Sequence, residues 1–172
     1  MKERKADLFE LAMEDGTDSI CITTNGQYLL NGKAAMGGGC ARVCADRWPE
    51  TAIRLGRLLK QLKNNVPYVI GALDKNAHYL EPTRQMIEKK EFKCLIFSFP
   101  TINKLIDGAN LPLIKQSATL LKNDCDQYKL TGIICGRMGS GIGGLRWADV
   151  KPEVEKILDD RFTIVSFEHE EL

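Results

Sequence analysis

Short runs of apolar, often β-branched residues recur along the chain, separated by longer stretches in which apolar and charged positions follow a helical spacing. Several of these runs contain almost no polar position, which is typical of strands that are covered on both faces of a sheet. The runs predict strands at residues 20–24, 68–73, 94–98, 132–135 and 162–167.

The stretches between the runs predict helices at residues 38–48, 51–64, 111–128 and 148–158. In the second of these, Ile53 and Leu62 lie on the same side as three other leucines, and Arg and Lys side chains lie opposite. Residues 74–92 are polar and irregular, so we expect a surface excursion there. The alternation of strands and helices predicts an α/β fold with a mainly parallel or mixed sheet, formed as one domain over residues 1–172.

The composition is that of an ordinary globular protein, with 44% hydrophobic residues, 27% charged residues and a net charge of +1. This charge argues against binding to nucleic acid or membranes through a global positive field. The six cysteines fall mostly within predicted strands and helices, so we expect buried free thiols. Cys40 and Cys44 could share a helix face, but no histidine lies near enough in the sequence to complete a zinc site. No run approaches the length of a membrane span and the N-terminus lacks a secretory apolar core, so we expect a cytoplasmic protein without membrane contact.

Two glycine-rich segments, at residues 23–41 and 136–147, carry the most chemical information. Each follows an apolar β-branched run and leads into a predicted helix. Glycine leaves backbone amides accessible to a ligand, and amides at a helix N-terminus attract anions such as phosphate. Ligands of open α/β sheets bind beyond the carboxyl ends of the strands, where both segments fall. The pair therefore predicts a site for a diphosphate, and so for a phosphate-bearing nucleotide.

Two common glycine-loop sites fit these segments poorly. A Walker-type loop ends in Gly-Lys-Ser/Thr so that the lysine reaches the phosphates, and neither segment has this ending. Residues 139–144 approach the dinucleotide fingerprint G-x-G-x-x-G. They lie so late in the chain that too few residues remain for a dinucleotide-binding half.

Five segments, in this order, resemble a macrodomain: ADLFE (residues 6–10), TDSICITTNG (17–26), MGGGCARVCADRWP (36–49), FSFPT (97–101) and GRMGSGIGGLRWADVKP (136–152). The resemblance runs over residues 6–167. It is strongest to the branch that contains phage macro proteins, DNA-linked ADP-ribose antitoxins and terminal ADP-ribose glycohydrolases. It implies a three-layer α/β/α fold around a mixed, mostly parallel sheet, and binding of ADP-ribose or a derivative. We expect no cofactor and assign no metal ligand, because no cluster of ligating residues appears in the sequence; a metal is neither required nor excluded.

The resemblance also implies ligand-binding positions in this chain. Asp7 lies where macrodomains place an acidic residue against the adenine amine. Asn25 lies where an asparagine binds the distal ribose, and it is also the candidate catalytic residue. From the residues alone, Asp7 and Asn25 also suit turns, so a purely structural role for each of them stays open. The two phosphate loops correspond to Gly37, Gly38 and Gly39, and to Gly139, Ser140, Gly141, Ile142 and Gly143.

Two positions depart from the hydrolytic members of this branch. Those enzymes carry a lysine just after the FPT-like strand end, where this chain has Ile102, and an aspartate in the second loop, where it has Gly143. Lys104 could replace the lysine only if its loop bulges. The oligomeric state stays open, and so does the choice between free ADP-ribose and an ADP-ribosylated macromolecule as partner. Because both catalytic positions differ, two functions also stay open. The first is hydrolysis of ADP-ribose 1″-phosphate or of an ADP-ribosyl linkage by a water that Asn25 orients, and the second is non-catalytic binding as a reader or nucleotide sponge.

Overall fold

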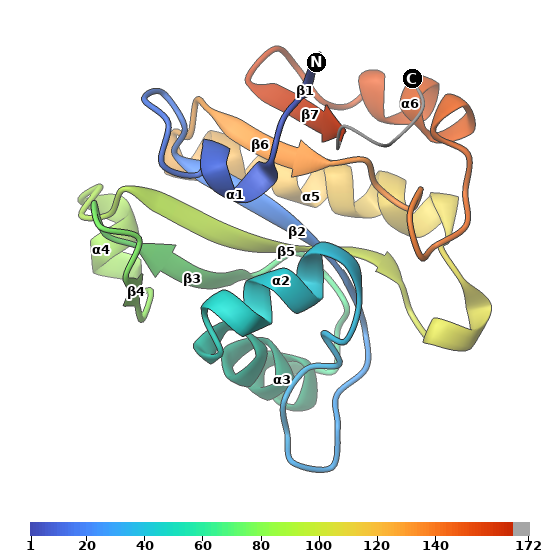
Figure 1. Ribbon diagram of the computed structural model, residues 1–172, viewed down its shortest axis with the longest axis horizontal. Coiled ribbons are helices and arrows are strands. Elements are labelled where there is room, and N and C mark those ends of the chain that lie inside the picture. Colours follow the sequence, from blue (N-terminus) through green and yellow to red (C-terminus); the bar gives the residue numbers. More distant parts are fainter. Residues whose placement is uncertain (167–172) are drawn as a thin grey trace.

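The computed structural model describes residues 1–166, which form a seven-stranded mixed sheet between two layers of helices (Figure 1). The strand order is β1-β7-β6-β2-β5-β3-β4. From β1 to β5 in this order, each strand is parallel to the next one, whereas β3 is antiparallel to both β5 and β4. The strands are β1 (Lys2–Lys5), β2 (Ser19–Asn25), β3 (Val69–Leu73), β4 (Tyr79–Leu80), β5 (Cys94–Ile102), β6 (Ile133–Gly136) and β7 (Phe162–Ser166).

The helices cover both faces of the sheet because successive strand residues point to opposite faces. In β2, Ile20 and Ile22 pack in the core formed with α1, α2 and α3, whereas Cys21 packs in the core formed with α5 and α6. The predicted three-layer α/β/α arrangement is therefore confirmed. Within residues 1–166, no helix is long and apolar enough to cross a membrane. The helices are α1 (Leu8–Leu11), α2 (Gly39–Arg47), α3 (Glu50–Leu62), α4 (Arg84–Glu88), α5 (Leu111–Tyr128) and α6 (Trp147–Glu155), with a 3₁₀ turn, η1, at Leu105–Asp107.

All five predicted strands are present, although residue 167, the predicted end of the last one, lies outside the described residues. No sequence pattern predicts β1, whose four residues KERK are all charged and exposed. This strand pairs in parallel with β7 at the edge of the sheet. Backbone pairing at the edge of a sheet needs no apolar side chain, so the hydrophobic pattern of the sequence does not predict this strand.

Two sequence expectations were wrong. Residues 74–92 are not an irregular excursion, because they contain β4 and the short helix α4. The hydroxyl of Thr83 caps α4 by accepting a hydrogen bond from the amide of Met86 at 3.1 Å. In α3, Ile53 and Leu62 are exposed, at 47% and 57% of their surface. The buried face is instead narrow and partly made of small residues: Thr51, Ala52, Leu55, Gly56 and Leu59.

The sheet brings the two glycine-rich segments to one edge. Strands β6, β2 and β5 are adjacent and parallel, so their carboxyl ends, at Gly136, Asn25 and Ile102, lie at the same edge of the sheet. The segment after β2 leads into α2, and the segment after β6 leads into α6. The predicted placement of both segments beyond strand carboxyl ends is therefore confirmed.

Candidate functional site

A cavity of ≈ 1010 Å³ lies at this edge of the sheet. Its lining draws on α1, on the loop between β2 and α2, on the ends of β5 and β6, and on the loop between β6 and α6. The structure thus brings together residues that are far apart in the sequence. The predicted site residues that line the cavity are Asp7, Asn25, Gly37, Gly38, Gly39, Gly139, Gly141, Ile142 and Gly143. Ser140, also predicted from the sequence, is not among the lining residues; its hydroxyl lies 3.5 Å from the carbonyl of Met138.

The two glycine loops meet through the side chain of Ile142. This residue is 66% exposed, and its Cδ1 lies so close to the backbone of Gly38 that a Cβ atom there would sit 2.4 Å from it. A side chain at position 38 would therefore push Ile142 aside. Glycine at this position allows the second loop to cover the start of α2.

The start of α2 offers unpaired amides to the cavity. Gly38 is the N-cap residue and, having no side chain, it supplies no capping hydrogen bond. The first amides of a helix have no partner within the helix, and the helix dipole adds positive potential at this end. The N-terminus of α2 is therefore suited to an anionic group.

The loop between β6 and α6 is fixed by its own backbone hydrogen bonds. The amide of Leu145 donates to the carbonyl of Gly139 at 2.9 Å, and the amide of Ala109 donates to the carbonyl of Gly143 at 3.0 Å. Within residues 1–166, no partner accepts a hydrogen bond from the amides of Gly141, Ile142 or Gly143. This loop therefore has a second set of free donors, in a segment that lines the same cavity and touches the start of α2 through Ile142.

Asn25 holds the loop that follows it. Its Nδ2 donates to the carbonyl of Ala35 at 2.9 Å, and its Oδ1 accepts from the amide of Gln27 at 2.9 Å. Both ends of the side-chain amide are thus used within the loop between β2 and α2. This loop also packs closely on α3, since a Cβ atom at Gly56 would lie 2.0 Å from the carbonyl oxygen of Gly32 (Figure 1).

Asp7 caps α1 at another part of the cavity wall. Its Oδ1 accepts hydrogen bonds from the amides of Phe9 at 2.7 Å and Glu10 at 3.2 Å. Phe9 lines the cavity beside it, with its ring centroid 6.1 Å from that of Trp48 and 4.9 Å from the Arg47 guanidinium carbon. A carboxylate next to a held aromatic ring can accept from an amino group of a heterocycle that lies against the ring.

The positions expected to hold catalytic groups do not hold them. Ile102 is buried at the end of β5 and closes the cavity wall, whereas Lys104 is exposed and is not among the lining residues. At Gly143 a Cβ atom would lie 2.5 Å from the Cβ of Ala109 and 2.7 Å from the carbonyl oxygen of Gly139. An aspartate therefore cannot occupy position 143 without moving this loop.

The ionisable side chains that line the cavity, within residues 1–166, are Asp7, Lys33, Cys40 and Arg137. Burial raises the pKa of the Cys40 thiol, which lies 3.2 Å from the Thr23 hydroxyl. All six cysteines are free, and all except the partly buried Cys40 are buried, which confirms the expectation of buried free thiols. Within the same residues, no three His, Cys, Asp or Glu side chains are grouped closely enough to hold a metal ion.

Sequence reasoning did not assign three features of this site. Lys33 lines the cavity, whereas its sequence context favours a solvated side chain over a phosphate contact. The hydroxyl of Thr24 is buried against the cavity and makes no hydrogen bond with any described residue. Exposed apolar side chains other than the predicted Ile142 also surround the cavity, and no periodic pattern marks them because they lie on separate elements: Leu29, Val43 and Leu105.

The fold has counterparts among solved structures. The Thermosipho africanus DarTG structure in complex with ADP-ribose matches with a TM-score of 0.71 and 16% identity over 96% of this chain, which spans 41% of that longer chain. The macrodomain of Thermus aquaticus DarG matches with a TM-score of 0.68 and 18% identity, covering 97% of both chains. The macrodomain of Mycobacterium tuberculosis DarG matches with a TM-score of 0.67 and 19% identity, covering 95% of both chains.

The chain has the macrodomain fold. No protein-family model matches the sequence, and no curated protein matches it either. At these identities the likeness shows the fold alone, so the function is argued below from the residues of the site. The macrodomain resemblance of the five sequence segments is nevertheless confirmed at the level of the fold.

Proposed function

We propose that this protein binds ADP-ribose, or an ADP-ribosyl group attached to a larger molecule, in the cavity between its two glycine loops. The observation that carries the proposal is the pair of amide sets, at the N-terminus of α2 and at residues 141–143, that are free within the described residues and meet across Ile142. Opposed donors at a helix N-terminus and in a glycine loop fit the two phosphates of a diphosphate. The structural neighbour from Thermosipho africanus was solved with ADP-ribose, which supports this choice of ligand.

The rest of the cavity fits the remaining parts of this ligand. Asp7 and Phe9 form a polar and aromatic corner for adenine, with the carboxylate accepting from the amine. Asn25 and Lys33 lie in and beside the loop after β2 and fit the distal ribose. The exposed apolar residues around the cavity, Leu29, Leu105 and Ile142, suit contact with a macromolecule that carries the ADP-ribosyl group.

Non-catalytic binding, as a reader or sponge, is the form of this function that the geometry favours. Position 102 is a buried isoleucine, position 143 cannot hold an aspartate without movement, and Lys104 is not among the lining residues. The side-chain amide of Asn25 uses one N–H and one oxygen lone pair to hold the loop backbone, and the remaining N–H and lone pair can serve a ribose hydroxyl as well as a water. Few side chains of the cavity are therefore available as catalytic groups for hydrolysis, whereas binding needs only the free amides and the contacts of the cavity wall.

Calorimetric titration with ADP-ribose tests the binding proposal. Gly141→Glu places a carboxylate in open space beside the free amides, where it repels a diphosphate, so we expect affinity to fall by about tenfold or more. Gln116→Glu adds the same charge on the exposed surface of α5 and serves as the matched control. Equal affinities for the two variants would refute the two-loop site.

Hydrolysis remains a second candidate because Lys33, a lysine of the loop after β2, lines the cavity that Asn25 also lines. We propose that, if the linkage is cleaved, Lys33 substitutes for the lysine that is absent from position 102. Phosphorus NMR with ADP-ribose 1″-phosphate follows both steps, since bound diphosphate signals shift and hydrolysis releases orthophosphate. Release that stops in Lys33→Met, with ADP-ribose affinity retained, supports this route. Shifted signals without release leave binding alone for this substrate.

A further inference from the structure

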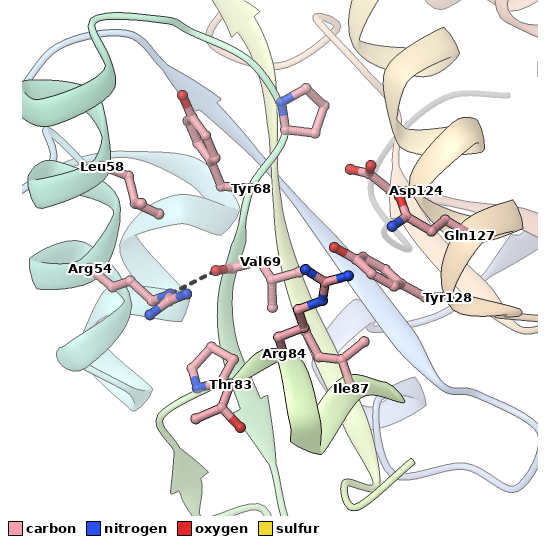
Figure 2. Close-up of a pocket in the computed structure, with 12 residues that line it drawn as sticks. Arg54, Leu58, Tyr68, Val69, Thr83, Arg84, Ile87, Asp124, Gln127 and Tyr128 are labelled. Atoms are coloured by element: carbon pink, nitrogen blue, oxygen red, sulfur yellow. Dashed lines mark hydrogen bonds between the residues drawn. The ribbon is translucent and has the colours of Figure 1, made fainter. Parts of the chain in front are cut away.

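A second cavity, of ≈ 400 Å³, lies between α3, β3, α4 and α5 and shares no lining residue with the first (Figure 2). Its volume falls within the range of small-molecule sites, about 300–1,000 Å³. In Figure 2, Asp124, Gln127 and Tyr128 project into it from α5, and Arg54 and Leu58 face them from α3. None of these residues takes part in the proposed ADP-ribose site.

The walls of this second cavity combine apolar and aromatic side chains with polar and charged ones. Pro67, Pro82 and Ile87 are buried in it, and the rings of Tyr68 and Tyr128 are partly buried. The hydroxyl of Tyr68 donates to the carbonyl of Asn64 at 2.7 Å, which holds that ring in place. Such walls suit a ligand with an apolar body, and tyrosine faces also attract cations.

The charged groups of this cavity are not balanced. The Arg54 guanidinium donates to Glu81 at 2.6 Å and to the carbonyl of Val69 at 2.8 Å, and Arg84 donates to Glu88 at 2.7 Å. Within residues 1–166, no hydrogen bond or ion pair reaches the carboxylate of Asp124. The two cations thus have acidic partners of their own, and the one uncompensated charge on the wall is negative.

Keeping this carboxylate in the wall costs the fold free energy. Burial raises the pKa of Asp124 to about 6, because the half-buried ionised form loses part of its hydration and gains no partner. A half-buried charge is stabilised when an opposite charge pairs with it. A cationic ligand would supply that partner.

We propose that this cavity binds a small organic ammonium ion, with the cation against the Asp124 carboxylate and its apolar body between the side chains of Tyr68, Tyr128 and Ile87. The cation would be held by a charge-assisted hydrogen bond and by the tyrosine faces. Arg84 is the competing cation within the protein, since its side chain is 86% exposed and can turn away from Glu88.

The test uses 2-phenylethylamine as the probe and 2-phenylethanol as a neutral analogue with the same apolar body. Each is titrated into ¹⁵N-labelled protein at millimolar concentrations, and amide shifts are followed in α3, β3 and α5. The proposal expects saturable shifts around this cavity with the amine and much smaller ones with the alcohol. Equal responses to both, or no saturable response to the amine, would overturn it.

Asp124→Asn keeps the shape of the side chain and removes its charge, and we expect about tenfold weaker amine binding. Asp15→Asn makes the same change in the exposed turn before β2 and is the matched control. Arg84→Met removes the competing cation, so amine binding is retained or strengthened. Equal affinity in the two Asp variants, or loss of amine binding in Arg84→Met, would contradict the assignment.

The dependence on pH provides an independent check. Among residues 1–166, the other charged or titratable groups that line this cavity are Arg54 on α3, Tyr68 before β3, Arg84 on α4 and Tyr128 on α5. Arginine and tyrosine side chains as classes do not ordinarily change charge between pH 5 and 7.5. Amine affinity should therefore fall as the pH drops through the Asp124 pKa of about 6, and should stay constant in Asp124→Asn. A pH-independent affinity of the unmodified protein would count against the carboxylate. ADP-ribose affinity should be unchanged in Asp124→Asn, so this proposal and the proposed function fail separately.

Discussion

Adding one methyl group at two glycines of the same loop separates a packing requirement from a ligand requirement. At Gly143 a new Cβ atom would lie 2.5 Å from the Cβ of Ala109 and 2.7 Å from the carbonyl oxygen of Gly139. At Gly141 nothing lies within 4 Å of the new atom. Neither glycine has φ in the left-handed region, so alanine is not excluded at either position by backbone conformation.

The structure sets the size of the expected effect. Carbon atoms pack best at about 3.5–4.0 Å, so Gly143→Ala must move Ala109 or the loop by about 1 Å. Overpacking of this kind costs about 1–3 kcal/mol, which corresponds to about fivefold to 150-fold in an equilibrium constant. Gly141→Ala should stay within about 0.5 kcal/mol of the unmodified protein, as surface substitutions usually do.

This strain can lower the affinity for ADP-ribose or the stability of the fold. Calorimetric titration with ADP-ribose measures the first, and thermal denaturation measures the second. We expect Gly143→Ala to lose affinity, melting temperature or both, and Gly141→Ala to lose little of either. Ala109→Gly in the Gly143→Ala background removes the nearer of the two contacts and should recover part of the loss. If Gly143→Ala matches Gly141→Ala in both measurements, the packing argument is refuted.

Substitutions at three further positions test other parts of the structure. Asp7→Ser keeps a capping oxygen for α1, so it should weaken ADP-ribose more than ribose 5-phosphate at little cost in melting temperature, whereas Asp7→Ala should also lose about 1 kcal/mol of stability. Asn25→Ala breaks two hydrogen bonds to the backbone, and we expect a loss of about 2 kcal/mol, seen as a melting temperature lower by about 4–8 °C. Asp124→Asn should stabilise the protein by about 1 kcal/mol at pH 7, after allowance for partial exposure, because the native pKa of about 6 lies above the ordinary value of 3.8. Between pH 3.8 and about 6 the Asp124 carboxyl is protonated in the folded chain and ionised in the unfolded chain, so the stability of the unmodified protein falls as the pH rises through this range. The extra stability of Asp124→Asn should therefore vanish towards pH 4, which melting curves at several pH values measure.

The buried strands and the meeting of the two glycine loops could be predicted because both follow from general rules. A strand covered on both faces must be apolar throughout, and the runs around Ile20 and Phe97 show this directly. Carboxyl ends of adjacent parallel strands share an edge, so the loops after β2 and β6 had to lie together once those strands were recognised.

The features that the sequence analysis did not predict depend on tertiary contacts, which cannot be read from local sequence patterns. The charged strand β1 exists because the backbone of β7 is available at the edge of the sheet. Lys33 reaches the cavity because its loop is packed against Gly56 of α3, a contact between distant parts of the chain. Ser140 and Gly141 are adjacent in one motif, yet Gly141 lines the cavity and Ser140 does not. A motif identifies such a loop without saying which of its residues face the ligand.

The two departures from the hydrolytic pattern have a common physical consequence. Ile102 is buried, with a carbonyl that accepts from the amide of Gly26, and Gly143 is held against Ala109. Restoring lysine at 102 would bury an amine in the cavity wall, and restoring aspartate at 143 would collide with Ala109. The double substitution Ile102→Lys with Gly143→Asp should therefore lower stability without creating hydrolysis of ADP-ribose 1″-phosphate, and Ala109→Gly is needed first to make room. The packing around the loop, and not only the identity of two side chains, thus determines which residues positions 102 and 143 can hold.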